Sequence, residues 1–484
     1  MKRKILALIV LLSAVTAGHS QNSQVLYFMN LPQATTLNPA FKPTGRFYLG
    51  LPGISDISVR LDNNFLSLSD LFTSGVISDS TLSFLERGPW LNDFLAGLGD
   101  NNSLEPQAGV RLFGLAFTVK DNLRFSLDIT ERAEANLVFP GDLFRLGLGG
   151  NSDFIGKTLD LSSFRTDMMV YHEIGLGASG NITEKLRIGG RLKILSGVAS
   201  AYLTNNHSKL TVNEDFTHTA DADISLNMSA PVLFTTESDG TIHGAEFDEA
   251  RFDDTRNAIS YLKELANPGA GIDLGAEYRF SEKLAVSAAV NDLGFIRWKR
   301  DLSQLTINST FKFNGLTMQD VYDESLDFEE LINWTIDSLQ NVLELADSPQ
   351  EYTTYLPAKV VAAFSYTPVR YFTLGLLSQT RFEGPQAHQS VTLSGNLHFR
   401  NIFSTTLAYT AANRRFDNLG FGMALRGGPF QFFVLVDNIP LKYSSFTSGE
   451  QTIRLPENMN TVNARLGLNL LFGNRERDKT LPPM

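Results

Sequence analysis

The side chains that could carry chemistry are few and widely spaced. The seven histidines do not cluster at the spacing of metal ligands, and His207, His218 and His243 form the nearest group. His172 and His398 fall within predicted strands, where a hydrogen-bonded structural histidine is the simpler interpretation. No HExxH or EF-hand pattern is present, no serine stands in a GxSxG context, and there is no cysteine. The sequence therefore predicts no catalytic residues, no metal site and no cofactor.

A basic ladder is the most informative set of charged residues. Its four members share one parity, while the other parity is apolar: Lys185, Arg187, Arg191 and Lys193 against Leu186, Ile188 and Leu192. On a strand the two parities point to opposite faces. If the apolar face meets lipid, the ladder faces a lumen, near carboxylates such as Asp128, Glu134 or Glu173. We favour a salt-bridge network that fills a closed barrel, and a path for anionic ligands is the second interpretation.

An acidic stretch and three helical segments stand apart from the rest of the chain. Carboxylates between Asp320 and Glu330 could bind Ca²⁺ through oxygen ligands, but a solvated acidic loop is the simpler interpretation. Apolar residues at helical spacing occur over 258–266 and 332–343, and a third helix is expected around 82–98. All three fall in long connections, so we expect helical inserts in outer loops, which either cap a barrel or form docking surfaces.

Most of the chain alternates with period two. Segments 123–130, 272–280 and 462–472 each place apolar residues on one parity and polar or small residues on the other. Charged residues make up 19% of the chain, there are 38 glycines and 35 phenylalanines, and no uncharged apolar run of helical length follows residue 20. These features exclude a helical membrane protein and are compatible with a membrane β-barrel. A net charge of -11 argues against a nucleic-acid partner.

Turn spacing favours a barrel over a soluble sandwich. Short connections near 120–121, 181–184, 281–282, 368–370, 401–402 and 427–429 alternate with long ones around 61–106, 139–165, 234–269, 298–355 and 441–460. Outer-membrane barrels alternate short periplasmic turns with long outer loops. The predicted strands are 45–60, 107–119, 122–138, 166–180, 185–203, 206–216, 220–233, 270–281, 283–297, 356–367, 371–383, 389–400, 403–412, 418–426, 430–440 and 461–472. This gives sixteen strands, or fourteen if 206–216 and 220–233 form only an outer hairpin.

The N-terminus has the pattern of a secretory signal peptide over residues 1–20. Lys2, Arg3 and Lys4 precede a short apolar run, and small residues Gly18 and Ser20 precede the predicted cleavage site. We therefore expect an exported protein in the outer membrane of a gram-negative bacterium. The predicted organisation is an N-terminal periplasmic or plug segment over 21–43, a barrel over 44–473 and a polar tail over 474–484.

Short motifs near the predicted first strand carry a family resemblance. Tyr27-Phe28-Met29-Asn30 and Leu37-Asn38-Pro39-Ala40-Phe41 resemble the start of FadL-type transporters and of the PorV/PorP-like barrels of type IX secretion and gliding. Leu356-Pro357-Ala358-Lys359-Val360 and the segment 291–298 also resemble this superfamily. The resemblance implies a fourteen-stranded barrel with an N-terminal plug in the lumen, to which Asn38, Pro39 and Ala40 would contribute. From the residues alone, an ordinary turn at Asn38-Pro39 is equally compatible.

Two functions follow from this all-β, closed antiparallel transmembrane β-barrel of 14–16 strands with a short N-terminal plug. The first is FadL-like passage of small hydrophobic molecules across the outer membrane. The alternative is a structural or adaptor barrel in a secretion, gliding or surface-assembly complex, which binds other outer-membrane or periplasmic proteins. A continuous apolar lining would favour transport, and a lumen filled by paired charges would favour the adaptor. A soluble exported β-protein is a third, weaker possibility.

Overall fold

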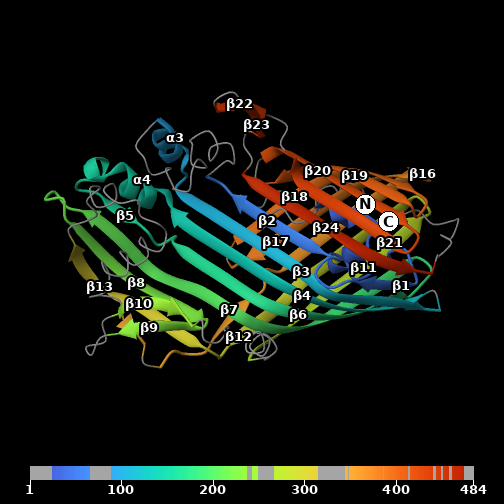
Figure 1. The fold of residues 1–484 in the computed structure, drawn as a ribbon, viewed down its shortest axis with the longest axis horizontal. Helices are drawn as coiled ribbons and strands as arrows, with labels where there is room; N and C mark the ends of the chain where they lie inside the picture. The colour runs from blue at the N-terminus through green and yellow to red at the C-terminus, as the bar shows by residue number, and fades with distance from the viewer. Residues whose placement is uncertain are drawn as a thin grey trace, which may run out of the picture.

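The computed structural model describes residues 24–65, 89–120, 122–236, 242–248, 266–313, 344–346, 348–384, 386–412, 415–439, 443–448, 451–456 and 460–473. Their main feature is a closed antiparallel barrel of fourteen strands (Figure 1). Two short pieces, β1 (Phe47–Gly50) and β2 (Ile57–Asn63), together form the first barrel strand. The others, in chain order, are β3 (Asn101–Val119), β4 (Leu123–Pro140), β6 (Arg165–Asn181), β7 (Leu186–Val212), β11 (Asn267–Ser281), β12 (Leu284–Trp298), β16 (Lys359–Val369), β17 (Phe372–Glu383), β18 (Gln386–Phe399), β19 (Phe403–Ala412), β20 (Arg415–Gly427), β21 (Phe430–Ile439) and β24 (Thr461–Phe472).

The barrel closes where its last strand pairs with its first. Phe47 of β1 lies opposite Phe472 of β24 on one side and Phe117 of β3 on the other. β2 continues the same two pairings beyond an irregular stretch at 51–56. Because the ring is complete, no barrel strand presents an unpaired edge.

The fourteen-strand count is the correct one, and the sixteen-strand alternative is wrong. β7 runs without a break to Val212, so residues 206–212 of the predicted strand 206–216 continue β7, and the rest form the turn into the next strand. β8 (His218–Ser229) pairs with this extension and, on its other side, with β13 (Leu302–Phe313). The chain thus builds a small sheet beyond the barrel wall. Period-two alternation could not separate the two cases because the extension keeps the same alternation.

The two ends of the barrel differ in their connections. One end, the loop end, carries the long connections, and the other, the turn end, carries the short turns (Figure 1). The loop end holds α3 (Pro89–Gly97), α4 (Gly141–Gly149), the 3₁₀ turn η4 (Asn151–Asp153), β5 (Thr158–Asp160), β9 (Val232–Thr236), β10 (Ile242–Phe247), β14 (Glu344–Leu345), β15 (Tyr352–Tyr355), β22 (Tyr443–Ser448) and β23 (Gln451–Pro456). The short turns fall where the sequence predicts them, for example at Gly428, whose φ of 60° a glycine adopts without strain.

The observed helices match the predicted helical stretches only in part. α3 lies within the stretch around 82–98 that was predicted to be helical. The helical stretches at 258–266 and 332–343 and the acidic residues 320–330 lie outside the described residues, apart from Ala266. α4 was not predicted, because a nine-residue segment with several glycines has low intrinsic helix propensity. Its Leu146 is buried against Leu159 and Val212, so packing holds the helix in place. No helix in the described ranges is long and apolar enough to cross a membrane.

The wall has apolar side chains outside and polar side chains inside. On β18, Leu393 and Leu397 point outward and are 58% and 37% exposed, whereas the inward Thr392 and Asn396 are fully buried. The same exposed apolar belt recurs around the ring, as at Leu192 on β7. A large exposed apolar surface is stable only when something apolar covers it. The barrel is therefore built to span a membrane, with its polar face enclosed.

The inner face of the wall is tightly packed around Gly197. A Cβ there would stand 2.3 Å from the ring of Trp298, which is fully buried and donates a 2.9 Å hydrogen bond from Nε1 to Thr354 Oγ1. We expect Gly197→Ala to lower the free energy of unfolding by about 1–3 kcal/mol, the usual cost of overpacking. Denaturant unfolding in detergent measures this. Gly427→Ala is the matched control, because a Cβ at Gly427 meets nothing within 4 Å. Equal stability of the two variants would contradict this packing.

Candidate functional site

The N-terminal segment of the described chain lies inside the barrel. Residues 24–44, called the inner segment below, form two 3₁₀ turns, η1 (Gln24–Phe28) and η2 (Pro32–Thr36), and lead into β1 (Figure 1). All five residues of η1 are buried. The segment contacts the wall along much of the lumen, from Asn469, three residues before β24 ends, to Asp437, two residues before β21 ends. The lumen is thus occupied by the chain's own N-terminal part.

One face of the inner segment packs on an apolar area of the inner wall. The segment contributes Val25, Leu26, Tyr27, Phe28, Met29, Leu31, Ala34 and Phe41, and the wall contributes Ala289, Val361, Ala363, Leu377, Ala408, Ala424, Phe433 and Leu435. The wall residues come from β12, β16, β17, β19, β20 and β21. We call their surface the apolar wall. The lumen of a water-filled barrel is polar, so an apolar area inside the wall is a specific feature of this chain.

Asn38, Pro39 and Ala40 lie where the inner segment approaches the neighbouring strands β7, β11 and β12. Asn38 is fully buried, and its Oδ1 accepts a 2.9 Å hydrogen bond from the Ala40 N–H. Its Nδ2 lies 3.4 Å from the carbonyl oxygens of Ala276 on β11 and Ala288 on β12. The motif is therefore both a local turn and a contact with the barrel wall.

Two wall glycines make this close approach possible. A Cβ at Gly275 would stand 2.1 Å from Asn38 Oδ1, and a Cβ at Gly189 would stand 2.3 Å from the Pro39 carbonyl oxygen. At Gly189 the clash is with backbone, so no larger side chain fits there without a backbone shift, whereas at Gly275 the atom in the way belongs to the Asn38 side chain. The period-two pattern showed both glycines on the lumen parity but gave no reason for them.

Further polar contacts tie the inner segment to strands that are distant in the sequence. Gln33 Nε2 donates to Asn469 Oδ1 at 2.7 Å, and Gln24 Nε2 donates to Ser390 Oγ at 2.8 Å. Asn291 Nδ2 donates to the Leu37 carbonyl oxygen at 2.8 Å. None of these contacts was predicted from the sequence. Period-two alternation shows that an amide such as Asn291 faces inward, but it does not show which residue the amide contacts.

The basic ladder reaches the inner segment through Arg187. Its Nε donates to the Ala40 carbonyl oxygen at 2.7 Å, and its Nη2 donates to Ser179 Oγ at 2.8 Å. Arg187 is buried, and so are Arg191 and Lys193. Lys185, the expected fourth member, is exposed in the turn that precedes β7. It lies outside the lumen because β7 begins only at Leu186.

Arg191 and Lys193 form the centre of a buried charge network. Arg191 contacts Asp128, lies 2.6 Å from a Glu173 oxygen and 3.3 Å from an Asp273 oxygen. Lys193 contacts Asp292 and lies 2.8 Å from Asp273. Every distance joins a side-chain nitrogen to a carboxylate oxygen. A buried ion pair contributes little net stability, but removing one partner strands a charge in a low-dielectric interior.

A second charged group connects opposite sides of the barrel. Counting strands from β3 through β4, β6, β7, β11, β12 and β16, β17 is the seventh, which places it across a fourteen-strand ring. The guanidinium of Arg381 on β17 nevertheless reaches two carboxylates across the lumen. Its Nη1 lies 3.4 Å from Oε2 of Glu105 on β3, and its Nη2 lies 3.8 Å from Oε2 of Glu134 on β4. Its side chain is 2% exposed. We call this group the cross-lumen bridge. Glu134, expected near the ladder, takes part here and also accepts a 3.2 Å hydrogen bond from the Tyr171 hydroxyl.

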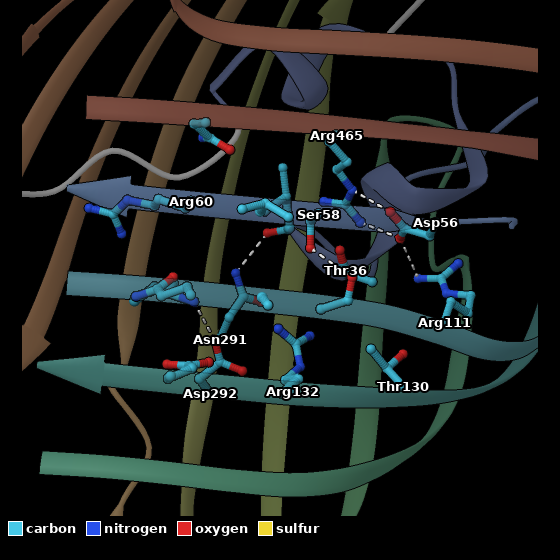
Figure 2. Close-up of a pocket in the computed structure, with 18 residues that line it drawn as sticks. Thr36, Asp56, Ser58, Arg60, Arg111, Thr130, Arg132, Asn291, Asp292 and Arg465 are labelled. Atoms are coloured by element: carbon cyan, nitrogen blue, oxygen red, sulfur yellow. Dashed lines mark hydrogen bonds and ion pairs between the residues drawn. The ribbon is translucent and has the colours of Figure 1, made fainter. Parts of the chain in front are cut away.

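A polar chamber lies next to the inner segment (Figure 2). Its lining reaches from Thr36 and Leu37 of the inner segment to Glu134 of the cross-lumen bridge. Its charged lining consists of Arg60, Arg111, Arg132, Lys359 and Arg465 with Asp56, Glu134 and Asp292. In Figure 2, Arg465 and Arg111 approach Asp56 from two sides, at 2.5 Å and 3.4 Å between nitrogen and oxygen. The chamber therefore suits water or polar solutes. The apolar wall is not part of it, because the inner segment covers that surface.

The histidines and carboxylates outside these groups make ordinary pairs. His172 Nδ1 lies 2.5 Å from a Glu131 oxygen, and His207 lies 3.5 Å from Asp221. Across the part of the chain that the structure describes, no group of three or more such side chains is arranged to hold a metal ion. The lumen is therefore the candidate site that the geometry defines.

Comparisons with known proteins give a family and weak structural similarities. The model of a family described as "Family of unknown function (DUF5723)" matches residues 39–437. No curated protein matches the chain. The P. putida toluene transporter TodX is 9% identical, with 95% of this chain and 97% of that chain covered and a TM-score of 0.42. The Ralstonia pickettii toluene transporter TbuX is 10% identical, with 96% of this chain and 98% of that chain covered and a TM-score of 0.40. A Pseudomonas aeruginosa FadL homologue is 10% identical, with 94% of this chain and 99% of that chain covered and a TM-score of 0.39.

Removing one cation tests whether the buried network is interdependent. We expect Arg191→Gln to lower the free energy of unfolding by about 3–5 kcal/mol, because the carboxylates around it lose their partner. The loss should shrink at acidic pH, where protonation of a stranded carboxylate removes its charge. Denaturant titrations at two pH values measure both effects.

Lys185→Gln is the matched control, since it removes a cation of the same ladder from an exposed position. We expect this variant to change stability by less than about 0.5 kcal/mol. Equal effects of the two substitutions would contradict the placement of Arg191 in a buried network.

Proposed function

The chain belongs to this family of unknown function (DUF5723), and from the geometry we propose that it is an outer-membrane barrel through which small hydrophobic molecules pass. The inner segment is the plug that closes the passage. Outer-membrane lipid surrounds the exposed apolar belt. Closed barrels with such a belt are the β-structures that span gram-negative outer membranes. The proposed export signal, residues 1–20, lies outside the described residues.

The apolar wall is the observation that carries this proposal. Leu377, Phe433 and Leu435 are at most 1% exposed because the inner segment covers them. If the segment moved aside, these side chains would become exposed inside the lumen, at a cost of roughly 25 cal/mol for each Å² uncovered. A hydrophobic solute that takes the place of the segment recovers that free energy. The same surface therefore retains the plug at rest and offers a hydrophobic solute a site during passage.

The chain's connection to β1 suits a movable plug. The last residues before β1 include Gly45 at a φ of 94°, a conformation that other residues rarely adopt. Displacement breaks polar anchors as well as apolar contacts, among them the 2.7 Å hydrogen bonds of Gln33 to Asn469 and of Arg187 to the Ala40 carbonyl oxygen. The solute replaces the apolar contacts, and water that enters with it can replace the hydrogen bonds.

A reversible cross-link between plug and wall tests the passage. The Cγ of Asn38 stands 3.0 Å from where a Cβ at residue 275 would lie, which is compatible with disulfide geometry. The chain has no native cysteine, so Asn38→Cys with Gly275→Cys introduces a single pair. We expect the oxidised variant to stop uptake of a small uncharged aromatic dye by intact cells, and a reductant to restore it.

Each single-cysteine variant under the same oxidant controls for loss of Asn38 and for crowding at Gly275. Cross-linking is verified by mass spectrometry of the peptide pair. Equal uptake through the oxidised and reduced double variant would contradict a moving plug.

The cross-lumen bridge favours a second candidate function, a structural or adaptor barrel without transport. Arg381 holds opposite walls together near the loop end, and the chamber beneath it is polar. In this case α3 and α4 at the loop end would be docking surfaces for other outer-membrane or periplasmic proteins.

Purification of the tagged protein from its own outer membrane in mild detergent separates the two candidates. Transport predicts co-purifying apolar molecules without a stoichiometric partner, measured by mass spectrometry of lipids and proteins. A stoichiometric protein partner with no enriched apolar molecule would contradict transport and support the adaptor.

A further inference from the structure

A second, smaller cavity lies at the loop end, beyond the cross-lumen bridge. β4 and β6 line one side, and β17 with the chain around Leu356 lines the other. We call it the mouth pocket. Arg381 and Glu134 line it and also belong to the cross-lumen bridge, so the pocket is next to the proposed passage without sharing the apolar wall.

The mouth pocket has an excess of negative charge. Its lining includes three carboxylates, Glu134, Asp167 and Glu383, and one cation, Arg381. The charge of Arg381 is also partly offset by Glu105, which lies outside the lining, 3.4 Å from the guanidinium. Two further basic groups lie close by: His388 is 3.7 Å from Glu383, and Arg165 stands two residues before Asp167 on the same face of β6. Neither of them lines the pocket.

Two hydrogen-bond acceptors in this lining have no donor. They are Asn136 Oδ1 and Asp167 Oδ1, each shielded from solvent. A third acceptor, Glu383 Oε2, faces His388 Nε2 at 3.7 Å. Asn136 as a whole is 7% exposed, and the register of β4 and β6 places it directly opposite Asp167. A buried acceptor without a donor carries an uncompensated desolvation cost, so two of them facing each other at one cavity favour an occupant that supplies donors.

The remainder of the lining is largely apolar. Met169 and Leu356 are each 5% exposed, and Pro357 adjoins them. An occupant must therefore combine hydrogen-bond donors and positive charge with a small apolar body. A bare metal ion does not match this lining, and no metal-binding arrangement is found among the described residues.

We propose that the mouth pocket binds a small alkylammonium ion. An ammonium group has three N–H donors and no acceptor, so it can donate to both orphaned acceptors, and its charge offsets the excess of carboxylates. Its alkyl chain packs against Met169 and Leu356. This site goes beyond the proposed passage of hydrophobic molecules and does not depend on it, because it uses different residues and would bind in a plugged barrel.

Titration calorimetry of the purified full-length barrel in detergent tests the site. The probes are butylammonium, the neutral butan-1-ol and the anion butanoate, which share a chain of similar length. We expect butylammonium to bind and the alcohol to bind at least about tenfold more weakly, since a hydrogen bond to a charged group contributes about 1.5–3 kcal/mol. Equal binding of ammonium and alcohol would overturn the proposal, as would no binding of either.

Variants then locate the site. Asp167→Asn keeps the side-chain shape but removes the charge, and we expect it to weaken butylammonium binding at least about tenfold. Glu184→Gln, in the exposed turn between β6 and β7 at the other end of the barrel, should leave the affinity unchanged. Thermal unfolding checks that both variants fold, and the comparison of probes on the unmodified protein needs no variant. Unchanged affinity in Asp167→Asn, or displacement of butylammonium by Ca²⁺ at equal concentration, would overturn the assignment.

Discussion

Because the barrel wall is apolar outside, most of its polar side chains point inward and must be paired within the lumen. Water covers such groups in an open pore, but here the lumen is occupied by residues 24–44 and by ionic side chains. The carboxylates around Arg191 and the long reach of Arg381 to Glu105 follow from that requirement. Unpaired, each would carry a desolvation cost of several kcal/mol.

The same constraint divides the lumen into two unlike halves. β16 to β21 bear the apolar wall that the inner segment covers, whereas β2 to β7 bear most of the paired charges. The inner segment matches both, since it packs Phe28 and Leu26 on the first half and accepts a hydrogen bond from Arg187 on the second. A segment that fits two different surfaces is held in one orientation. In the proposed function, a hydrophobic solute opens the barrel by replacing the apolar contacts of this segment.

Local patterns predicted the wall well because they record only which face each residue occupies. The predicted strand 430–440, for example, is observed as Phe430–Ile439, and 461–472 is observed at those bounds. The sequence could not predict which inward groups meet, because Arg381 and Glu105 are brought together only by closure of the ring. It also missed β13, whose pairing with β8 lies beyond the wall, and it included the exposed Lys185 in the ladder because parity alone does not show where a strand begins.

At rest the barrel is closed by its inner segment, and the ion pairs that cross the lumen hold the wall around it. Electrical conductance of the purified protein in a planar lipid bilayer shows whether this is so, because a water-filled path carries ions whatever its biological cargo. We expect no steady ionic current through the intact chain, and a stable current after deletion of residues 24–44. A steady current through the intact protein would mean that the inner segment does not close the barrel.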